Sequence, residues 1–205
     1  MQINLYLAQT LRQATKEVIK NVEVSQNLDL RNFIVVPDRF SLQAEKLLFQ
    51  ELGISSTFNI DVISISKLAS LVLKLSGNQF KTQSNLEGML LVYKILIEHQ
   101  AEFESLKDAN LSIDLAKEIF LTISQLKSCE ISADKFLKSA NELANQKLID
   151  IAKIYSFYEC SEREKIDAAD LITLFAQQIE ESELINNSNF YVADFDSFTS
   201  KARTI

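Results

Sequence analysis

The chain has 205 residues, of which 47% are hydrophobic and 24% charged, so it is long enough to bury a sizeable core in one or two domains. Its 28 Asp and Glu against 21 Lys and Arg give a formal net charge of −7, which argues against an independent, strongly basic nucleic-acid binder and confines any DNA contact to a local site. No apolar run reaches the roughly 20 residues of a membrane span and no signal-peptide pattern is visible, so we expect a cytoplasmic protein.

Strand–helix units dominate the first 80 residues. Thr10 and Gln13 are spaced as a capping box at the start of the first helix. In the second unit the only proline, Pro37, takes the chain out of the sheet, and Gly53 terminates the helix. Ser66 is predicted to be the N-cap of the third helix. The predicted strands are residues 3–8, 33–36 and 58–65, and the predicted helices are residues 10–22, 41–52 and 67–76.

Apolar residues at helical spacing fill the stretch from residue 84 to about residue 163. Ser84 and Glu87 form another capping box, at the head of a long helix predicted to continue to about Leu106. Two further apolar stripes predict two more long helices, and a short helix is predicted between them near residues 137–143. The first stripe contains Leu115, Ile119, Ile123 and Leu126, and the second contains Leu148, Ile151, Ile154, Tyr155 and Tyr158. Because no strict heptad persists, we expect a helical insertion that packs on itself rather than a coiled coil.

The strand–helix pattern returns near the end of the chain, where Asp167 is placed to cap a helix over residues 168–179 and residues 190–193 predict a strand. Parallel strands need crossover connections, so these elements predict an α/β fold, a parallel sheet flanked by helices with a large all-helical insertion. We expect the α/β domain to comprise residues 1–80 and 165–205, and the insertion residues 81–164. A chain that stops so soon after a strand indicates an N-terminal fragment of a longer protein.

Metal and catalytic signatures are weak in this sequence. Cys129 and Cys160 have no metal-ligand spacing and His99 is the only histidine, so reduced thiols are favoured over a disulfide or a metal site. No serine lies in a nucleophile elbow, and a single histidine in a helical block supports no catalytic triad. We therefore predict no catalytic residues, no metal and no cofactor.

Five sequence blocks stand out by their order and spacing along the chain. They are VVPDRFSLQAEKLLFQEL (35–52), VISISKLASLV (62–72), KLIDIAKIYSFYE (147–159), KIDAADLI (165–172) and YVADFDSFTSKA (191–202). Together they resemble the N-terminal region of the B subunit of the AddAB/RexAB helicase-nucleases, especially the RexB type, and the resemblance covers nearly the whole chain. The resemblance implies a P-loop NTPase-type topology similar to subdomain 1A of a UvrD-like superfamily 1 helicase, with the insertion similar to subdomain 1B.

The same resemblance implies two contacts with the backbone of single-stranded DNA. Residues 39–44 lie where helicases have motif Ia, and residues 64–69 where they have motif Ib; the candidates are Arg39, Ser41, Gln43, Ser64, Ser66 and Lys67. Hydroxyls and free amides at helix N-termini, with the two basic side chains, fit phosphate contacts. The alternative, that these serines only cap helices, stays open at this point.

The nucleotide-binding positions depart from those of a working motor. After the first predicted strand the chain has Thr10 and Arg12 among residues 9–13, with neither the glycines nor the lysine of a Walker A loop. After the last strand, Asp194 and Asp196 flank Phe195, so the position of the catalytic glutamate is apolar. We expect no ATP hydrolysis, and we prefer a capping role for these aspartates to a metal site.

The predicted function is that of a catalytically inactive helicase-like region of an AddB/RexB-type exonuclease subunit, with a DNA-threading and scaffold role in double-strand-break repair and recombination. The implied partners are an AddA/RexA-type helicase-nuclease subunit and single-stranded DNA. The alternative is a stand-alone acidic protein-interaction module that does not bind DNA. The acidic balance favours the alternative, and the hydroxyl-rich turns after successive strands favour DNA.

Overall fold

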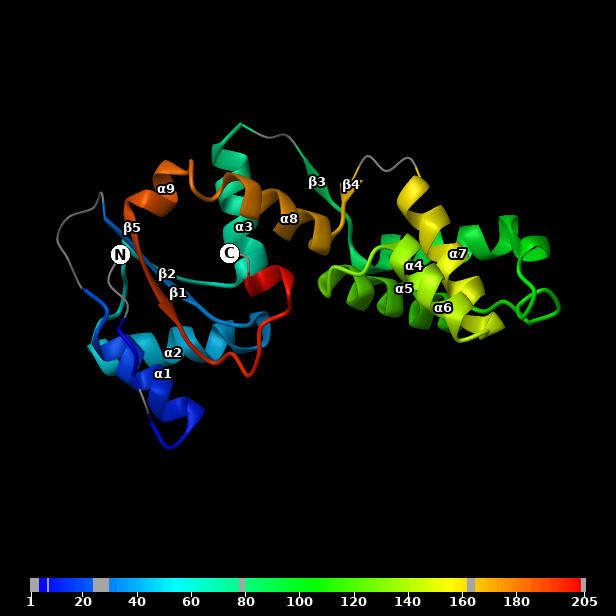
Figure 1. Ribbon diagram of the computed structural model, residues 1–205. Helices are drawn as coiled ribbons and strands as arrows, with labels where there is room; N and C mark the ends of the chain where they lie inside the picture. The colour runs from blue at the N-terminus through cyan, green and yellow to red at the C-terminus, as the bar shows by residue number, and fades with distance from the viewer. Residues whose placement is uncertain (1–3, 7, 24–29, 78–79, 162–164, 204–205) are drawn as a thin grey trace. The chain divides into compact units, whose positions relative to one another are not determined.

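The computed structural model describes residues 4–6, 8–23, 30–77, 80–161 and 165–203. The chain divides into two compact units (Figure 1). The α/β unit contains residues 1–78, 172–198 and 205, and the helical unit contains residues 79–171 and 199–204. Among the described residues, no helix has the length and apolar character that a membrane span requires.

A three-stranded parallel sheet in the order β2-β1-β5 forms the centre of the α/β unit. Its strands are β1 (Arg31–Val35), β2 (Ile60–Ile63) and β5 (Ser188–Val192), and its helices include α1 (Leu11–Lys20), α2 (Ser41–Leu52), α3 (Ile65–Leu75) and the short α9 (Glu183–Asn186). Figure 1 shows α1 and α2 on one face of the sheet and α3 on the other. Side chains of α1 and α2 pack with Ile34 and Val36 in a buried apolar cluster on the first face. This architecture confirms the predicted α/β class with parallel strands.

Local signals predicted α2 well, because it spans Ser41–Leu52 as expected and ends at Gly53 in the left-handed conformation, with φ of 63°. The helix after β2 begins earlier than predicted. Ser64, not Ser66, is its N-cap, since the Ser64 hydroxyl accepts a hydrogen bond from the Lys67 amide at 3.4 Å. Both serines have the right chemistry for a cap, and the end of the strand at Ile63 decides between them.

The strand predicted over residues 3–8 is absent from the described part of that segment. Ile3 and Leu7 lie outside the described residues, whereas residues 4–6 and 8 belong to no strand. Within the described sheet β1 has neighbours on both sides, so this segment would have to pair with an edge strand. The alternation of its side chains is a local signal and does not supply that partner.

The helical unit contains α4 (Asn85–Glu98), α5 (Ile113–Ser128), α6 (Ala133–Glu142) and α7 (Gln146–Cys160) around one core. The capping box of Ser84 and Glu87 is confirmed in full. Two short strands that the sequence did not predict, β3 (Lys81–Thr82) and β4 (Lys165–Ile166), form a parallel pair. Helix α8 (Ala168–Gln178) follows β4 and continues from the helical unit into the α/β unit.

The helix that begins after Ser84 is shorter than predicted, because α4 ends at Glu98 and not near Leu106. Tertiary hydrogen bonds hold the following segment in another conformation. The buried Asp150 of α7 accepts bonds from the backbone amides of Glu104 and Ser105 at 3.1 and 2.7 Å. An apolar periodicity alone carries no information about such a partner.

Candidate functional site

The candidate site is the edge of the parallel sheet where its strands end. Val35 of β1 is in register with Ile63 of β2 and with Val192 of β5, so the three strands end at the same level. A short 3-10 turn, η1 (Asp38–Phe40), follows β1; α3 follows β2; and a loop with two aspartates follows β5. Sheets of this kind place their ligands outside the carboxyl ends of the strands.

Arg39 is brought together with Asp196 at this edge. Arg39 Nη2 lies 2.6 Å from Asp196 Oδ2, so an ion pair joins the turn after β1 to the loop after β5. The Arg39 guanidinium also lies over the ring of Phe40, 4.8 Å from its centroid. The side chains of the ion pair are 64% and 61% exposed, so solvent screens their attraction and ligands can reach them.

The hydroxyls of Ser64 and Ser66 connect β2 and α3 to the turn after β1. Their Oγ atoms are 3.1 Å apart, and the Ser66 hydroxyl donates a hydrogen bond to Asp38 Oδ2 at 3.2 Å. Ser64 is buried and caps α3, as described above. Both hydroxyls thus have structural partners, and their contact with DNA stays a prediction.

The other three DNA-binding candidates lie in the first turns of α2 and α3. Gln43 and Lys67 are exposed. Ser41 begins α2, and its Oγ is buried without a hydrogen-bond partner among the described residues. Phe40 precedes α2 and supplies no side-chain cap, but α2 continues directly from η1. The backbone amide of Ser41 already donates to the Asp38 carbonyl, so the first amide of this helix is not free for an anion.

The positions that the sequence predicted as a degenerate nucleotide site are Thr10, Arg12, Asp194 and Asp196. The Thr10 hydroxyl accepts a hydrogen bond from the Gln13 amide at 3.2 Å and caps α1, while Arg12 is exposed on that helix. Asp194 has a φ of 62° and accepts a hydrogen bond from the buried Thr15 hydroxyl at 2.7 Å. Asp194 and Asp196 therefore have different partners. Within the described ranges, no group of three or more His, Cys, Asp or Glu is arranged to hold a metal ion.

Sequence reasoning missed four side chains at this edge. Asp38 accepts from Ser66, Phe40 lies under Arg39, and the rings of Phe195 and Phe198 stack with centroids 4.7 Å apart. The available signal was the spacing of two phenylalanines among acidic and polar residues directly after a strand. Phe198 is exposed, whereas Phe40 and Phe195 are half-buried. Exposed aromatic rings are typical of surfaces that stack on nucleic-acid bases.

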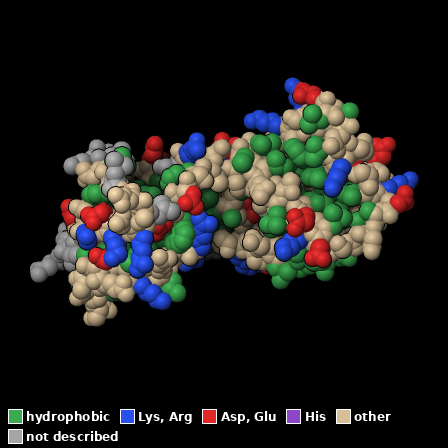
Figure 2. Space-filling view, turned by 90° about the horizontal axis from the view of Figure 1, so that it is seen from below, with side chains coloured by type: hydrophobic (Ala, Val, Ile, Leu, Met, Phe, Trp, Pro, Cys, Tyr) green, Lys and Arg blue, Asp and Glu red, His purple; other side chains and the backbone are tan. Residues whose placement is uncertain are grey.

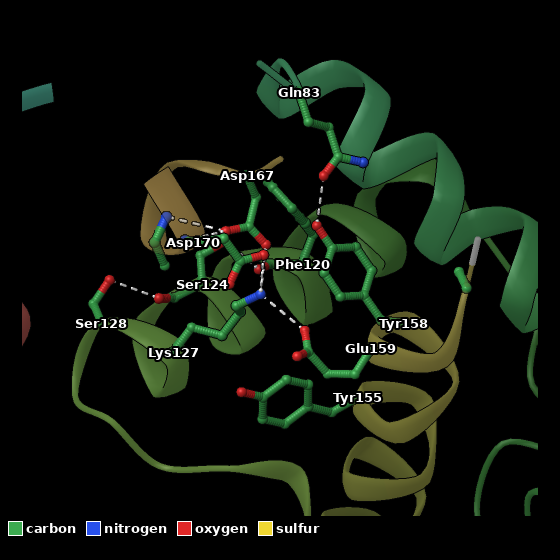
Figure 3. A network of polar contacts seen from close by, with 12 residues as sticks. Gln83, Phe120, Ser124, Lys127, Ser128, Tyr155, Tyr158, Glu159, Asp167 and Asp170 are labelled. Carbon is green, nitrogen blue, oxygen red and sulfur yellow. Dashed lines mark hydrogen bonds and ion pairs between the residues drawn. The ribbon is translucent and has the colours of Figure 1, made fainter. Parts of the chain in front are cut away.

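A second polar cluster lies in the helical unit around Lys127 of α5 (Figure 3). Lys127 Nζ lies 2.8 Å from Glu159, 2.7 Å from Asp167 and 2.9 Å from Asp170, and its side chain is 4% exposed. Burial lowers the pKa of Lys127, but the hydrogen bonds to Asp167 and Glu159 outweigh it and hold the pKa above its usual value. A lysine nucleophile needs a lowered pKa, so we assign this cluster to structure.

The surface carries charges of both signs. Basic and acidic side chains both lie on the face drawn in Figure 2, with hydrophobic side chains between them. Among the residues discussed at the sheet edge, Asp38, Asp194 and Asp196 outnumber Arg39 and Lys67. Any attraction for DNA at this edge therefore depends on individual basic side chains, as the net charge indicated.

Comparison with known proteins gives one consistent result. A family model described as ADDB, N-terminal matches residues 11–205. The chain is 26% identical over 187 residues to the B subunit of the ATP-dependent helicase/deoxyribonuclease of Oceanobacillus iheyensis, covering 84% of this chain and 16% of that protein. It is similarly 26% identical over 187 residues to the protein of the same description from Clostridium kluyveri, covering 88% of this chain and 16% of that protein.

A relative from Pediococcus pentosaceus with the same description is 24% identical over 199 residues, covering 88% of this chain and 17% of that protein. The chain therefore spans only 16–17% of the length of these three curated relatives. What the rest of such a protein does is separate from what these residues do.

Proposed function

This chain belongs to the ADDB N-terminal family, and from that membership we propose that it is the helicase-like N-terminal region of an AddB/RexB-type subunit acting in DNA double-strand-break repair and recombination. The observation that carries this proposal is the family match over residues 11–205. The relatives named above are subunits of ATP-dependent helicase/deoxyribonucleases. We further propose that the region guides and supports single-stranded DNA without hydrolysing ATP.

The proposed DNA surface is the carboxyl edge of the sheet in the α/β unit. It offers the exposed side chains of Arg39 and Lys67 for phosphates. The rings of Phe195 and Phe198 supply an aromatic face for bases. A phosphate-dominated contact of this kind recognises single strands with little regard to sequence.

Loss of motor chemistry is proposed from the residues themselves. The segment before α1 has neither the glycines that wrap phosphates nor the lysine that reaches them, and Thr10 is occupied as a helix cap. Asp194 and Asp196 have separate partners. Isothermal titration of the chain with ATP and magnesium should give no binding heat, and measurable ATP binding would contradict this part of the proposal.

The proposed partner is an AddA/RexA-type helicase-nuclease subunit, since the relatives are described as the B subunits of their enzymes. Such a partner would supply the ATP-driven movement of DNA. We propose that the chain then contributes a passive surface along which the strand passes. Co-expression followed by affinity purification of one of the two proteins tests whether the pair forms.

The central experiment measures binding of a fluorescein-labelled oligothymidine by anisotropy over a series of salt concentrations. Arg39→Ala and Lys67→Ala are each expected to weaken binding about threefold to tenfold at low salt and to reduce its salt dependence. Arg31→Ala and Lys74→Ala are matched controls, because Arg31 begins β1 at the opposite edge of the sheet and Lys74 lies in the last turn of α3. Equal losses in the control variants would refute the assignment of this edge.

The second candidate function is an acidic protein-interaction module that does not bind DNA. Three large apolar side chains on one side of α4 favour it, since Leu86, Leu90 and Ile97 are 60%, 46% and 54% exposed. Absence of oligothymidine binding even at low salt, with retained binding of the partner protein, would favour this module over the DNA-guiding role.

A further inference from the structure

The cation best placed to bind DNA at the sheet edge already has an anion bound to it. Arg39 Nη2 donates to Asp196 Oδ2 at 2.6 Å, across 157 residues of sequence. A carboxylate presents the same acceptor oxygens to a guanidinium as a phosphate does. The two anions therefore compete for one arginine.

We propose that Asp196 occupies Arg39 in the place of a DNA phosphate and so sets the affinity of this edge for single strands. While Asp196 is paired with Arg39, its negative charge offsets that of the guanidinium, so a phosphate binds Arg39 more tightly when the Asp196 side chain turns away. This inference rests on the proposed DNA-guiding function and adds the residue that opposes it. It assigns Asp196 an inhibitory role that is separate from its position in a degenerate motor motif.

The ion pair between Arg39 and Asp196, which we call the latch, can open and close reversibly. Both side chains are more than half exposed, at 64% and 61%, so the ion pair contributes little to folding stability and is readily exchanged for another anion. The ring of Phe40 lies 4.8 Å from the Arg39 guanidinium and gives it a second contact that does not involve Asp196.

A second aspartate at this edge, Asp38, also binds a side chain that was predicted to contact DNA. Asp38 Oδ2 accepts from the Ser66 hydroxyl at 3.2 Å, so this candidate donor is also bound to a carboxylate of the edge. Asp194 differs, because its carboxylate is held by the Thr15 hydroxyl of α1. Of the three aspartates, Asp196 alone is ion-paired to a proposed DNA-binding cation in the described part of the chain.

The test compares Asp196→Asn with Asp61→Asn in anisotropy titrations of labelled oligothymidine at low salt. Asp61 is a matched control, because it also pairs with an arginine, Arg31, at 3.5 Å with both side chains about half exposed, and it lies on β2 away from the carboxyl edge. Each variant removes one negative charge. We expect Asp196→Asn to tighten binding about threefold or more, and Asp61→Asn to change it less than about twofold.

A double-mutant cycle separates the latch from general charge effects. In an Arg39→Ala background, Asp196→Asn should increase the affinity for oligothymidine no more than Asp61→Asn does. An equal gain from the two asparagine variants, or a full gain from Asp196→Asn without Arg39, would overturn the latch. If the unaltered chain binds oligothymidine and Asp196→Asn does not change the affinity, the latch is overturned and the DNA-guiding function stands. If neither the unaltered chain nor any variant binds, both are overturned.

Discussion

Lys127 and Asp167 form a buried ion pair, with Nζ and Oδ2 2.7 Å apart, that joins two helices 40 residues apart in sequence. The other carboxylate oxygen of Asp167 accepts hydrogen bonds from the amides of Ala169 and Asp170 at 3.0 and 2.9 Å. One side chain thus caps α8 and ties its first turn to α5. The capping role of Asp167 was predicted from sequence, and the lysine that balances its charge was not.

Replacing Lys127 should destabilise the chain strongly. In Lys127→Met, the carboxylates of Glu159, Asp167 and Asp170 lose the ammonium group that all three contact. We expect the free energy of unfolding, measured by urea denaturation, to fall by about 3–5 kcal/mol. Lys117→Met is the control, because Lys117 is exposed on the same helix, and it should cost less than about 0.5 kcal/mol. Equal effects of the two substitutions would contradict the assigned role.

The same cluster predicts a loss of stability at alkaline pH. Burial, followed by the charge of Glu159, raises the pKa of Tyr155 from 10.0 to about 12. A group with a raised folded-state pKa stabilises the fold fully below its unfolded pKa, and that contribution is lost as the pH rises through the folded value. The free energy of unfolding should therefore decline above about pH 10. The raised pKa of Lys127 is a second cause of this decline.

Urea denaturation at several pH values between about 8 and 12 measures this decline. Tyr155→Phe removes the hydroxyl that titrates, together with its hydrogen bond of 3.1 Å to the Ile131 carbonyl. The variant should be less stable than the parent at neutral pH and should show a shallower alkaline decline, because it lacks one of the groups whose pKa is raised by folding. A decline of unchanged slope would show that Tyr155 does not titrate in the way proposed.

Local signals in the sequence predicted much of the fold. The capping box of Ser84 and Glu87, the αL terminator Gly53 and the cap Asp167 each act within a few residues, so the sequence pattern contains the whole interaction. The parallel character of the sheet followed from the repeated strand–helix units. Assignment of the two units to helicase-type subdomains stays a prediction.

The long-range contacts of the candidate site could not be predicted in this way. Arg39 and Asp196 are separated by 157 residues and Thr15 and Asp194 by 179, so no local pattern connects them. Parallel strands do bring their carboxyl ends to one edge, and this is why the sequence could place Arg39 at that edge without naming its partner. The two-residue strands β3 and β4 are too short to give a periodic signal.

Close packing of α4 on α5 depends on Gly88. A Cβ added there would lie 2.6 Å from Cζ of the buried Phe120 ring. Gly88→Ala gains about 1 kcal/mol of helix propensity, but the overlap with Phe120 costs about 1–3 kcal/mol. We expect a lower thermal midpoint despite the better helix former. Phe120→Leu should reduce the cost of Gly88→Ala in a double-mutant cycle, and strictly additive effects would contradict this account.

Ser64 and Ser66 differ in structural role although only one residue separates them. Ser64 is buried and caps α3, whereas Ser66 lies inside the helix and contacts Asp38 at the exposed edge. Ser64→Ala should therefore lower the free energy of unfolding by about 1 kcal/mol, and Ser66→Ala by less than about 0.5 kcal/mol. If the edge binds DNA, Ser66→Ala should still weaken oligothymidine binding, because its hydroxyl is the more accessible donor. A larger loss of stability in Ser66→Ala than in Ser64→Ala would indicate that Ser66 is the N-cap, as the sequence predicted, and would contradict the different roles assigned to the two serines.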